Sequence, residues 1–261
     1  MGIYAMPQPH WLIQRGLYRE EHDFALIERT LAMHDISFTP VDAQHGHVIT
    51  ELPHYTDPVI ILGGYSLMRY AQAHQLTPGY YDVQDMHAWM HHYGEHMLNA
   101  GAYIGPLRDA MPHDCVFVRP AADSKAFTGT TLDSPEEFHQ WRMDMIATRP
   151  LCTPDLPIVM APLVAIHRES RFFVIDNKII GTSVYKINGQ IRTTPHVYPE
   201  ETTFVQRMIA TWTPARAFVI DIATTDMGQK IVELNCINCA GFYEANIPAI
   251  ILALNDIAKT A

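Results

Sequence analysis

Apolar residues in the first part of the chain form short runs separated by segments with helical spacing. The runs HWLIQR (10–15) and ISFTPVDA (36–43) predict strands, and an amphipathic pattern near residues 20–34 predicts a helix between them. A third apolar run, DPVIILGGY (57–65), ends in two glycines and is followed by another helical pattern. The order strand, helix, strand, strand, helix predicts a small α/β lobe with a mainly parallel sheet.

The pattern changes after residue 115. CVFVRP (115–120) predicts a strand, and a loop rich in Ser, Thr and Gly follows it. The motif SPEE, with Ser134 as N-cap, predicts the start of a helix. Residues 157–186 are typical of antiparallel strands, with IDNKII as a hairpin signal, and an amphipathic helix is expected over about 242–258.

Residues 217–235 predict a second hairpin that gathers polar side chains on one face. Side chains alternate between the two faces of a strand. With the turn centred near Met227, Asp221 lies directly across from Glu233, and Asn235 shares that face. The alternate positions are apolar, so one face is suited to a core and the other carries two carboxylates and an amide.

Two interpretations of this polar face remain open. Hard oxygen ligands of this kind suit Mg²⁺ or Mn²⁺, usually with substrate phosphates in the same shell. A half-exposed hairpin with a solvated polar face is the alternative. Opposed like charges are destabilising without a compensating cation, which favours the metal site. The double glycine at 63–64 is likewise either a ligand approach to backbone amides or a tight turn.

The motif Cys236-x-x-Cys239 follows the hairpin directly. It is consistent with half of a zinc site, with a redox pair or with two packed thiols. A zinc site needs two further ligands, and Cys115 and Cys152 are isolated. The surrounding pattern also lacks the strand-to-helix context of a thioredoxin-like pair, so packed thiols are favoured.

Composition and charge narrow the classes of protein. The 261 residues are 48 % hydrophobic and 18 % charged, which is ordinary for a globular chain. A net charge of −10 argues against non-specific binding to nucleic acid or anionic membranes. Without a signal-peptide pattern, a long apolar run or a cysteine framework, we expect a reduced cytosolic protein.

Over nearly its whole length, and in order, the sequence resembles the ATP-grasp superfamily. Within it, the sequence is similar to the clade of small proteins, frequent in phages and bacteria, that is named after its arginine and two lysines. The pieces that carry the resemblance are WLIQRGLY, VIILGGYSLMRYA, GEHMLNA, FVRPAADSKAFTG, ESRFFVIDNKIIGTSVYK and ELN followed by AGFY. It implies an α/β (α+β) fold with a small Rossmann-like lobe (1–112), an ATP-grasp small lobe (113–160) and a C-terminal lobe with the metal site (161–261).

In that family a carboxylate and an E-x-N motif hold Mg²⁺ against the ATP phosphates, at positions that here are Asp221, Glu233 and Asn235. The resemblance also implies that Lys125 and Arg119 meet phosphate. A surface ion pair is the alternative for Arg119.

Backbone groups at Ala161 and Leu163 match the hinge that binds the adenine edge. Glu169 and Arg171 match positions that meet ribose, phosphate or acceptor, with a structural salt bridge as the alternative. Lys186 and Arg192 match positions that add positive charge near the γ-phosphate or an anionic acceptor. Asn238 either assists the metal site or caps a turn.

The implied function is an ATP- and Mg²⁺-dependent ligase that activates a carboxylate as an acyl phosphate, joins it to an amine or similar nucleophile and releases ADP. Fixed cations that neutralise phosphate charge meet the chemical demand of such a reaction. The alternatives are a regulatory ATP-binding protein and a kinase-like phosphotransferase. We expect a small-molecule or peptide substrate, bound near residues 65–110 and 190–205, rather than nucleic acid, and a monomer or homodimer.

Overall fold

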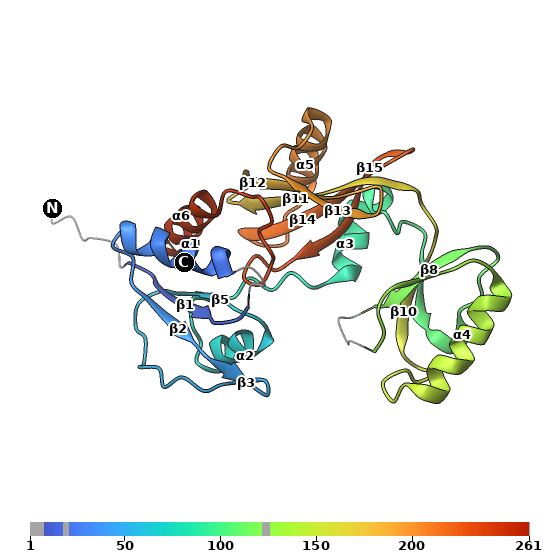
Figure 1. The fold of residues 1–261 in the computed structure, drawn as a ribbon, viewed down its shortest axis with the longest axis horizontal. Coiled ribbons are helices and arrows are strands. Elements are labelled where there is room, and N and C mark those ends of the chain that lie inside the picture. The colour runs from blue at the N-terminus through green and yellow to red at the C-terminus, as the bar shows by residue number, and fades with distance from the viewer. Residues whose placement is uncertain (1–7, 18–20, 122–125, 261) are drawn as a thin grey trace.

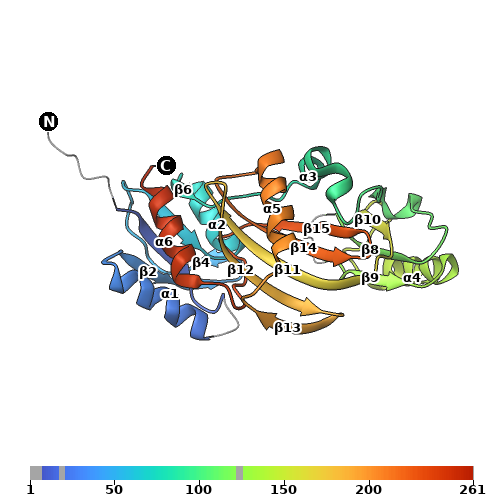
Figure 2. The same cartoon turned by 90° about the horizontal axis from the view of Figure 1, so that it is seen from above.

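The computed structural model describes residues 8–17, 21–121 and 126–260. Three lobes follow one another along the long axis of the molecule (Figure 1). The N-terminal lobe lies at one end, a small lobe with helix α4 lies at the other, and the C-terminal lobe lies between them. Figure 2 shows the same order from above.

The N-terminal lobe is the predicted parallel sheet with two helices. Its strand order is β2-β1-β5-β6, and all three pairings are parallel. The strands and helices are β1 (His10–Gln14), β2 (Phe38–Val41), β5 (Val59–Leu62), β6 (Pro78–Gly79), α1 (Glu21–Met33) and α2 (Tyr65–Ala73). Every residue of β5 is buried, because elements cover both faces of the sheet. A small ribbon of β3 (Ala43–Gln44) and β4 (His47–Val48) lies beside it.

The small lobe is an antiparallel sheet with one helix. Its order is β7-β10-β8-β9. The elements are β7 (Tyr103–Pro106), η2 (Leu107–Asp109), β8 (Val116–Pro120), β9 (Thr130–Leu132), α4 (Pro135–Thr148) and β10 (Pro157–Pro162). Ser134 caps α4, accepting a hydrogen bond from the Glu137 backbone N–H at 3.1 Å, as the SPEE motif predicts. The sheet begins at β7, ahead of the boundary that the sequence predicts after residue 112.

The C-terminal lobe is built on an antiparallel sheet with the order β13-β12-β11-β14-β15. The strands are β11 (Ile166–Ile175), β12 (Lys178–Ile187), β13 (Gln190–Thr194), β14 (Ala217–Thr225) and β15 (Gly228–Asn235). The predicted IDNKII hairpin joins β11 to β12, with Asp176 and Asn177 both at positive φ. One face of the sheet packs on α3 (Met86–Tyr93) and α5 (Pro199–Thr211). The short helix η1 (Gly94–His96) follows α3.

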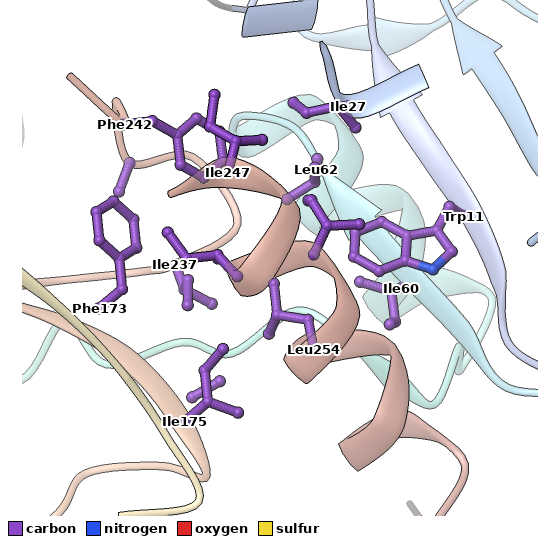
Figure 3. Close-up of a cluster of buried hydrophobic side chains, with 14 of the residues drawn as sticks. Trp11, Ile27, Ile60, Leu62, Phe173, Ile175, Ile237, Phe242, Ile247 and Leu254 are labelled. Carbon is purple, nitrogen blue, oxygen red and sulfur yellow. The ribbon is translucent and has the colours of Figure 1, made fainter. Parts of the chain in front are cut away.

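Helix α6 (Ile247–Ala258) joins the C-terminal lobe to the N-terminal lobe. It contacts α1 and β5 on one side and β11 and β12 on the other. Figure 3 shows Leu254 of α6 in one buried cluster with Trp11 from β1 and Ile175 from β11. The Trp11 indole Nε1 donates to Asn255 Oδ1 at 3.0 Å. The predicted start of this helix at 242 is wrong, because the side chain of Asn246 caps the helix through the Ala249 N–H and Ile247 is its first residue.

A bulge sets the register of the β14–β15 hairpin. Thr225 pairs with Gly228, so the turn lies slightly before the predicted centre at Met227. The pairing then shifts by one residue, from Ile222 with Ile231 to Asp221 with Glu233. The extra residue on β15 restores the predicted facing of the two carboxylates. Among the described residues, no helix is both long and apolar enough to cross a membrane.

Candidate functional site

A cleft of about 1390 Å³ opens between the lobes. Its walls come from parts of the chain that are far apart in sequence. The N-terminal lobe contributes Gly64, Tyr65 and Tyr80, the small lobe contributes Ile104, Arg119, Phe127, Trp141 and Arg149, and the end of β15 with the turn after it contributes Glu233, Asn235, Cys236 and Cys239. The cleft therefore combines an aromatic and apolar side with a side that carries charge.

The three predicted metal ligands lie together at the end of β15. Asn235 Nδ2 donates to Asp221 Oδ2 at 3.2 Å and to Glu233 Oε1 at 3.0 Å. Glu233 and Asn235 line the cleft, whereas Asp221 lies behind them and is 1 % exposed. Burial and the neighbouring Asp221 carboxylate raise the pKa of Glu233. A cation in the cleft would relieve this repulsion.

Arg171 on β11 supplies a positive charge to Asp221 from the opposite side. Its Nε and Nη2 donate to the two carboxylate oxygens at 2.8 and 2.7 Å. Its Nη1 donates to the Gly241 carbonyl at 3.0 Å. The guanidinium lies 5.7 Å from the ring centre of Tyr185 and 5.2 Å from that of Tyr243. Of the roles left open for Arg171, this structure contains a structural salt bridge, and its partner is Asp221.

A second charged cluster lies next to Arg171 on the same sheet. Lys186 Nζ forms an ion pair with Glu169 Oε1 at 2.9 Å, and the Tyr185 hydroxyl donates to Glu169 Oε2 at 2.9 Å. Glu169 and Lys186 are therefore brought together, as their predicted roles require. Arg192 on β13 is exposed and bonds Gln190 at 3.2 Å. In this part of the described chain, neither Lys186 nor Arg192 lines the cleft.

Arg119 on β8 is the predicted phosphate-binding residue that the structure places in the cleft. Burial lowers its pKa, and the charge of Glu233 opposes that shift. Arg119 and the carboxylate of Glu233 therefore face the same space from two lobes. Lys125 lies outside the described residues. Ala161 is buried in β10 and Leu163 follows it, exposed; neither is among the described residues that line the cleft.

The aromatic wall of the small lobe is a part of the site that sequence reasoning missed. Phe127 and Trp141 meet edge to face, with ring centres 5.0 Å apart. Both line the cleft, as does Arg149 just after α4. Phe127 follows a loop whose polar residues carry the sequence signal, and Trp141 lies within a predicted helix. No local signal separates such aromatic residues from core residues.

Asn238 anchors the turn after β15 to the N-terminal lobe. Its Nδ2 donates to the Ile61 carbonyl at 2.7 Å, and its Oδ1 accepts from the Tyr81 N–H at 2.9 Å. The Gly63 N–H donates to the Asn238 carbonyl at 2.8 Å. Both ends of the amide are therefore engaged in joining the two lobes. Among residues 8–17, 21–121 and 126–260, no three His, Cys, Asp or Glu side chains are grouped as a metal site, so the zinc alternative gains no further ligands.

Comparisons with solved structures find the same fold in proteins of low sequence identity. A D-cycloserine synthetase matches with a TM-score of 0.65 at 10% identity, covering 95% of this chain and 99% of its own. A D-alanine–D-alanine ligase from Coxiella burnetii matches with a TM-score of 0.66 at 13% identity, covering 97% and 96%. The corresponding ligase from Bacillus anthracis, complexed with ATP, matches with a TM-score of 0.61 at 10% identity, covering 97% of both chains.

A search of curated proteins finds no match. The model of one protein family does match, and it describes an ATP-grasp domain, family 3 of the clade named after its arginine and two lysines. The match spans residues 61–254, from β5 to α6, and so takes in the cleft and every described element that lines it. The mixed α/β architecture of three lobes agrees with this assignment. The chain belongs to the ATP-grasp superfamily, as a member of this third family of the arginine-and-two-lysines clade.

Proposed function

We propose that this protein is an ATP- and Mg²⁺-dependent ligase that activates a carboxylate as an acyl phosphate and transfers the acyl group to an amine or similar nucleophile. Membership of the ATP-grasp superfamily supports the use of ATP. The proteins of similar fold include ligases that join amino acids, as their names state, which supports the reaction class.

The observation that carries the proposal is the meeting of opposite charges in the cleft. Arg119 enters from the small lobe, and Glu233 and Asn235 enter from the C-terminal lobe. A nucleotide triphosphate with a divalent cation has the complementary pattern, because the cation binds oxygen ligands and the phosphates bind arginine. The apolar and aromatic wall around Phe127 and Trp141 suits a nucleobase.

The donor set fits Mg²⁺ or Mn²⁺. Glu233 offers a carboxylate to the cleft, and the amide of Asn235 donates through its nitrogen, which leaves its oxygen as a ligand. Asp221 would join the shell only by giving up a bond to Arg171. When bound, the ion would neutralise phosphate charge as the transferred phosphoryl group develops. We assign the holding of the ion to Glu233 and Asn235, with Asp221 as their support.

The other cationic residues would act on phosphate and acceptor. Arg119 would hold the nucleotide phosphates from the small lobe. Lys186, paired with Glu169, would serve an anionic acceptor if its ion pair opens on binding. Lys125 and Arg192 keep their proposed roles at the phosphates and at the acceptor. A small molecule or a short peptide suits the net charge of −10 better than a nucleic acid does.

The test is a screen for acceptor-stimulated ADP release. Purified protein is incubated with ATP, Mg²⁺ and panels of amino acids and peptides, and the products are identified by mass spectrometry. A ligated product with stoichiometric ADP and phosphate is expected. A stable phosphorylated product would point to a kinase-like enzyme, and binding of Mg-ATP without turnover on any panel would point to a regulatory protein.

Matched variants make the screen specific to the site. Glu233→Gln removes a metal ligand and is expected to abolish Mg²⁺-dependent turnover while the circular dichroism spectrum stays unchanged. Glu136→Gln, on the exposed side of α4, is the control and should keep full turnover. Wild-type ADP release from Glu233→Gln would overturn the assignment of the metal site.

A further inference from the structure

The turn after β15 places two thiols in the wall of the cleft. Cys236 is buried and Cys239 is exposed, and neither is in a disulfide. The Cys239 N–H donates to the Cys236 carbonyl at 3.2 Å, so the two cysteines are the first and fourth residues of one β-turn. Such positions have Cα atoms within about 7 Å. A disulfide spans Cα separations of about 4.4–6.8 Å, so the backbone already holds the pair within bridging range.

The side chains of the two cysteines converge on one oxygen atom. The Tyr80 hydroxyl lies 3.2 Å from Cys239 Sγ. Burial raises the pKa of Tyr80, and both thiols add to that shift by charge and hydrogen bonding. Cys236 Sγ also lies 3.9 Å from Asp82 Oδ1. Both sulfur atoms therefore point to the same side of the turn, as a disulfide between them requires.

The middle of this turn is fixed, whereas its first residue adjoins the proposed metal site. Ile237 is fully buried in the cluster that Figure 3 shows, and Asn238 is bonded to Ile61 and Tyr81. Cys236 directly follows Asn235, whose amide bridges Asp221 and Glu233. Drawing the sulfur atoms to a bond length of about 2.05 Å requires rotation at the cysteines. Because the middle of the turn is anchored, that rotation is passed to Asn235.

We propose that Cys236 and Cys239 are a reversible dithiol–disulfide pair, oxidised by small-molecule disulfides such as oxidised glutathione, and that closing the disulfide weakens nucleotide binding. The second half rests on the proposed function. The sulfur of exposed Cys239 attacks one sulfur of the oxidant, forms a mixed disulfide and releases one thiol. The sulfur of Cys236 then attacks Cys239 and releases the second thiol. The two protein thiols lose two electrons and two protons, which the oxidant gains as it becomes two thiols.

The test oxidises the full-length protein with oxidised glutathione and maps its cysteines by mass spectrometry of non-reduced peptides. The expected product is a peptide lighter by two hydrogen atoms, with Cys236 and Cys239 linked. Mg-ATP affinity is measured by calorimetry on reduced, oxidised and re-reduced protein. Since coupling between sites spans about 5- to 150-fold, we expect affinity to fall at least about fivefold on oxidation and to return with dithiothreitol.

Variants separate the pair from the other cysteines. Cys239→Ser should lose the response to oxidant, whereas Cys115→Ser, outside the cleft, should keep it. Lasting glutathione on Cys239, or no oxidation at the pair, would overturn the proposal. A mapped disulfide with unchanged affinity would overturn the effect on nucleotide binding. A reduced protein that binds no nucleotide would instead refute the proposed function, and peptide mapping would still decide whether the pair exists.

Discussion

Arg171 and Asp221 form a two-pronged ion pair across adjacent strands, with donor–acceptor distances of 2.8 and 2.7 Å and side chains that are 10 % and 1 % exposed. The pair places a fixed cation next to the carboxylate cluster at the end of β15. Its geometry makes Asp221 the internal partner of a protein cation, while Glu233 and Asn235 face the cleft.

Removing Arg171 should destabilise the protein strongly. Arg171→Met leaves Asp221 buried and opposite Glu233 without its cation, and such a loss costs about 3–5 kcal/mol of unfolding free energy. Urea denaturation measures the cost. The double variant Arg171→Met with Asp221→Asn removes the stranded charge and should recover part of the loss, since contacting residues are not additive. A double variant as unstable as the sum of its singles would contradict this account.

Glu233 should make stability depend on pH. Burial and Asp221 raise the pKa of Glu233 above its ordinary value of 4.5, so the folded chain holds this proton more tightly than the unfolded chain does. Ionisation of Glu233 therefore lowers the unfolding free energy as pH rises from the unfolded-state pKa to the folded-state pKa. Below that window the group contributes no penalty.

Glu233→Gln tests this pH dependence. The variant should gain stability relative to wild type as pH rises through the window and then keep a constant advantage. Denaturation curves from about pH 4 to about pH 7 cover the range in which a raised glutamate titrates. The absence of any change in the difference between the two proteins over that range would show that Glu233 is not perturbed by its surroundings.

Glu201 should be a large contributor to the stability of the C-terminal lobe. Its side chain is 0 % exposed and accepts hydrogen bonds from Arg168, Ser170 and Thr224 at 2.7, 3.0 and 3.1 Å. Glu201→Ala leaves these buried donors unpaired and should cost about 3–5 kcal/mol. The neighbouring Glu200 is exposed, so Glu200→Ala is the control and should change stability by less than about 0.5 kcal/mol. Equal losses in the two variants would refute the assignment.

Arg119 should contribute to nucleotide affinity. Arg119→Met removes the guanidinium that faces the cleft, and a charged hydrogen bond contributes about 1.5–3 kcal/mol. The affinity for Mg-ATP, measured by calorimetry, should fall by about tenfold or more, since about 1.4 kcal/mol corresponds to tenfold. Arg29→Met, on the exposed side of α1, is the matched control. A wild-type affinity in Arg119→Met would place the phosphates elsewhere.

Local patterns are sufficient for the elements and for the polar face of the β14–β15 hairpin. The alternation of side chains predicts that Asp221, Glu233 and Asn235 share a face, and the pairing confirms that Asp221 opposes Glu233. The parallel sheet of the first lobe is predictable for a related reason, since the order of strands and helices restricts the topology. The bulge after Asp221 is not predictable, because the turn alone gives a register that is one residue different.

Partners that come from distant segments are beyond a single sequence. Spacing along the chain places Arg171 with Glu169, two residues away, yet its ion-pair partner is Asp221 on the neighbouring strand. The sequence leaves Asn238 as a metal assistant or a turn cap, and in the structure it joins two lobes through Ile61 and Tyr81. Both contacts depend on how strands and lobes pack in three dimensions, and spacing along the chain carries no record of that.

The position of α6 has a consequence for how the protein is made. Trp11 and Asn255 are 244 residues apart in sequence, and their side chains bond within one cluster. The ribosome adds residues in order, so the apolar surface around Trp11 and Leu62 stays uncovered until α6 has left the exit tunnel. Native contacts of such long range also fold slowly. We therefore expect nascent chains that stop before Ile247 to be cleaved readily in the first lobe, and protease-resistant fragments of that length would show that this lobe folds early.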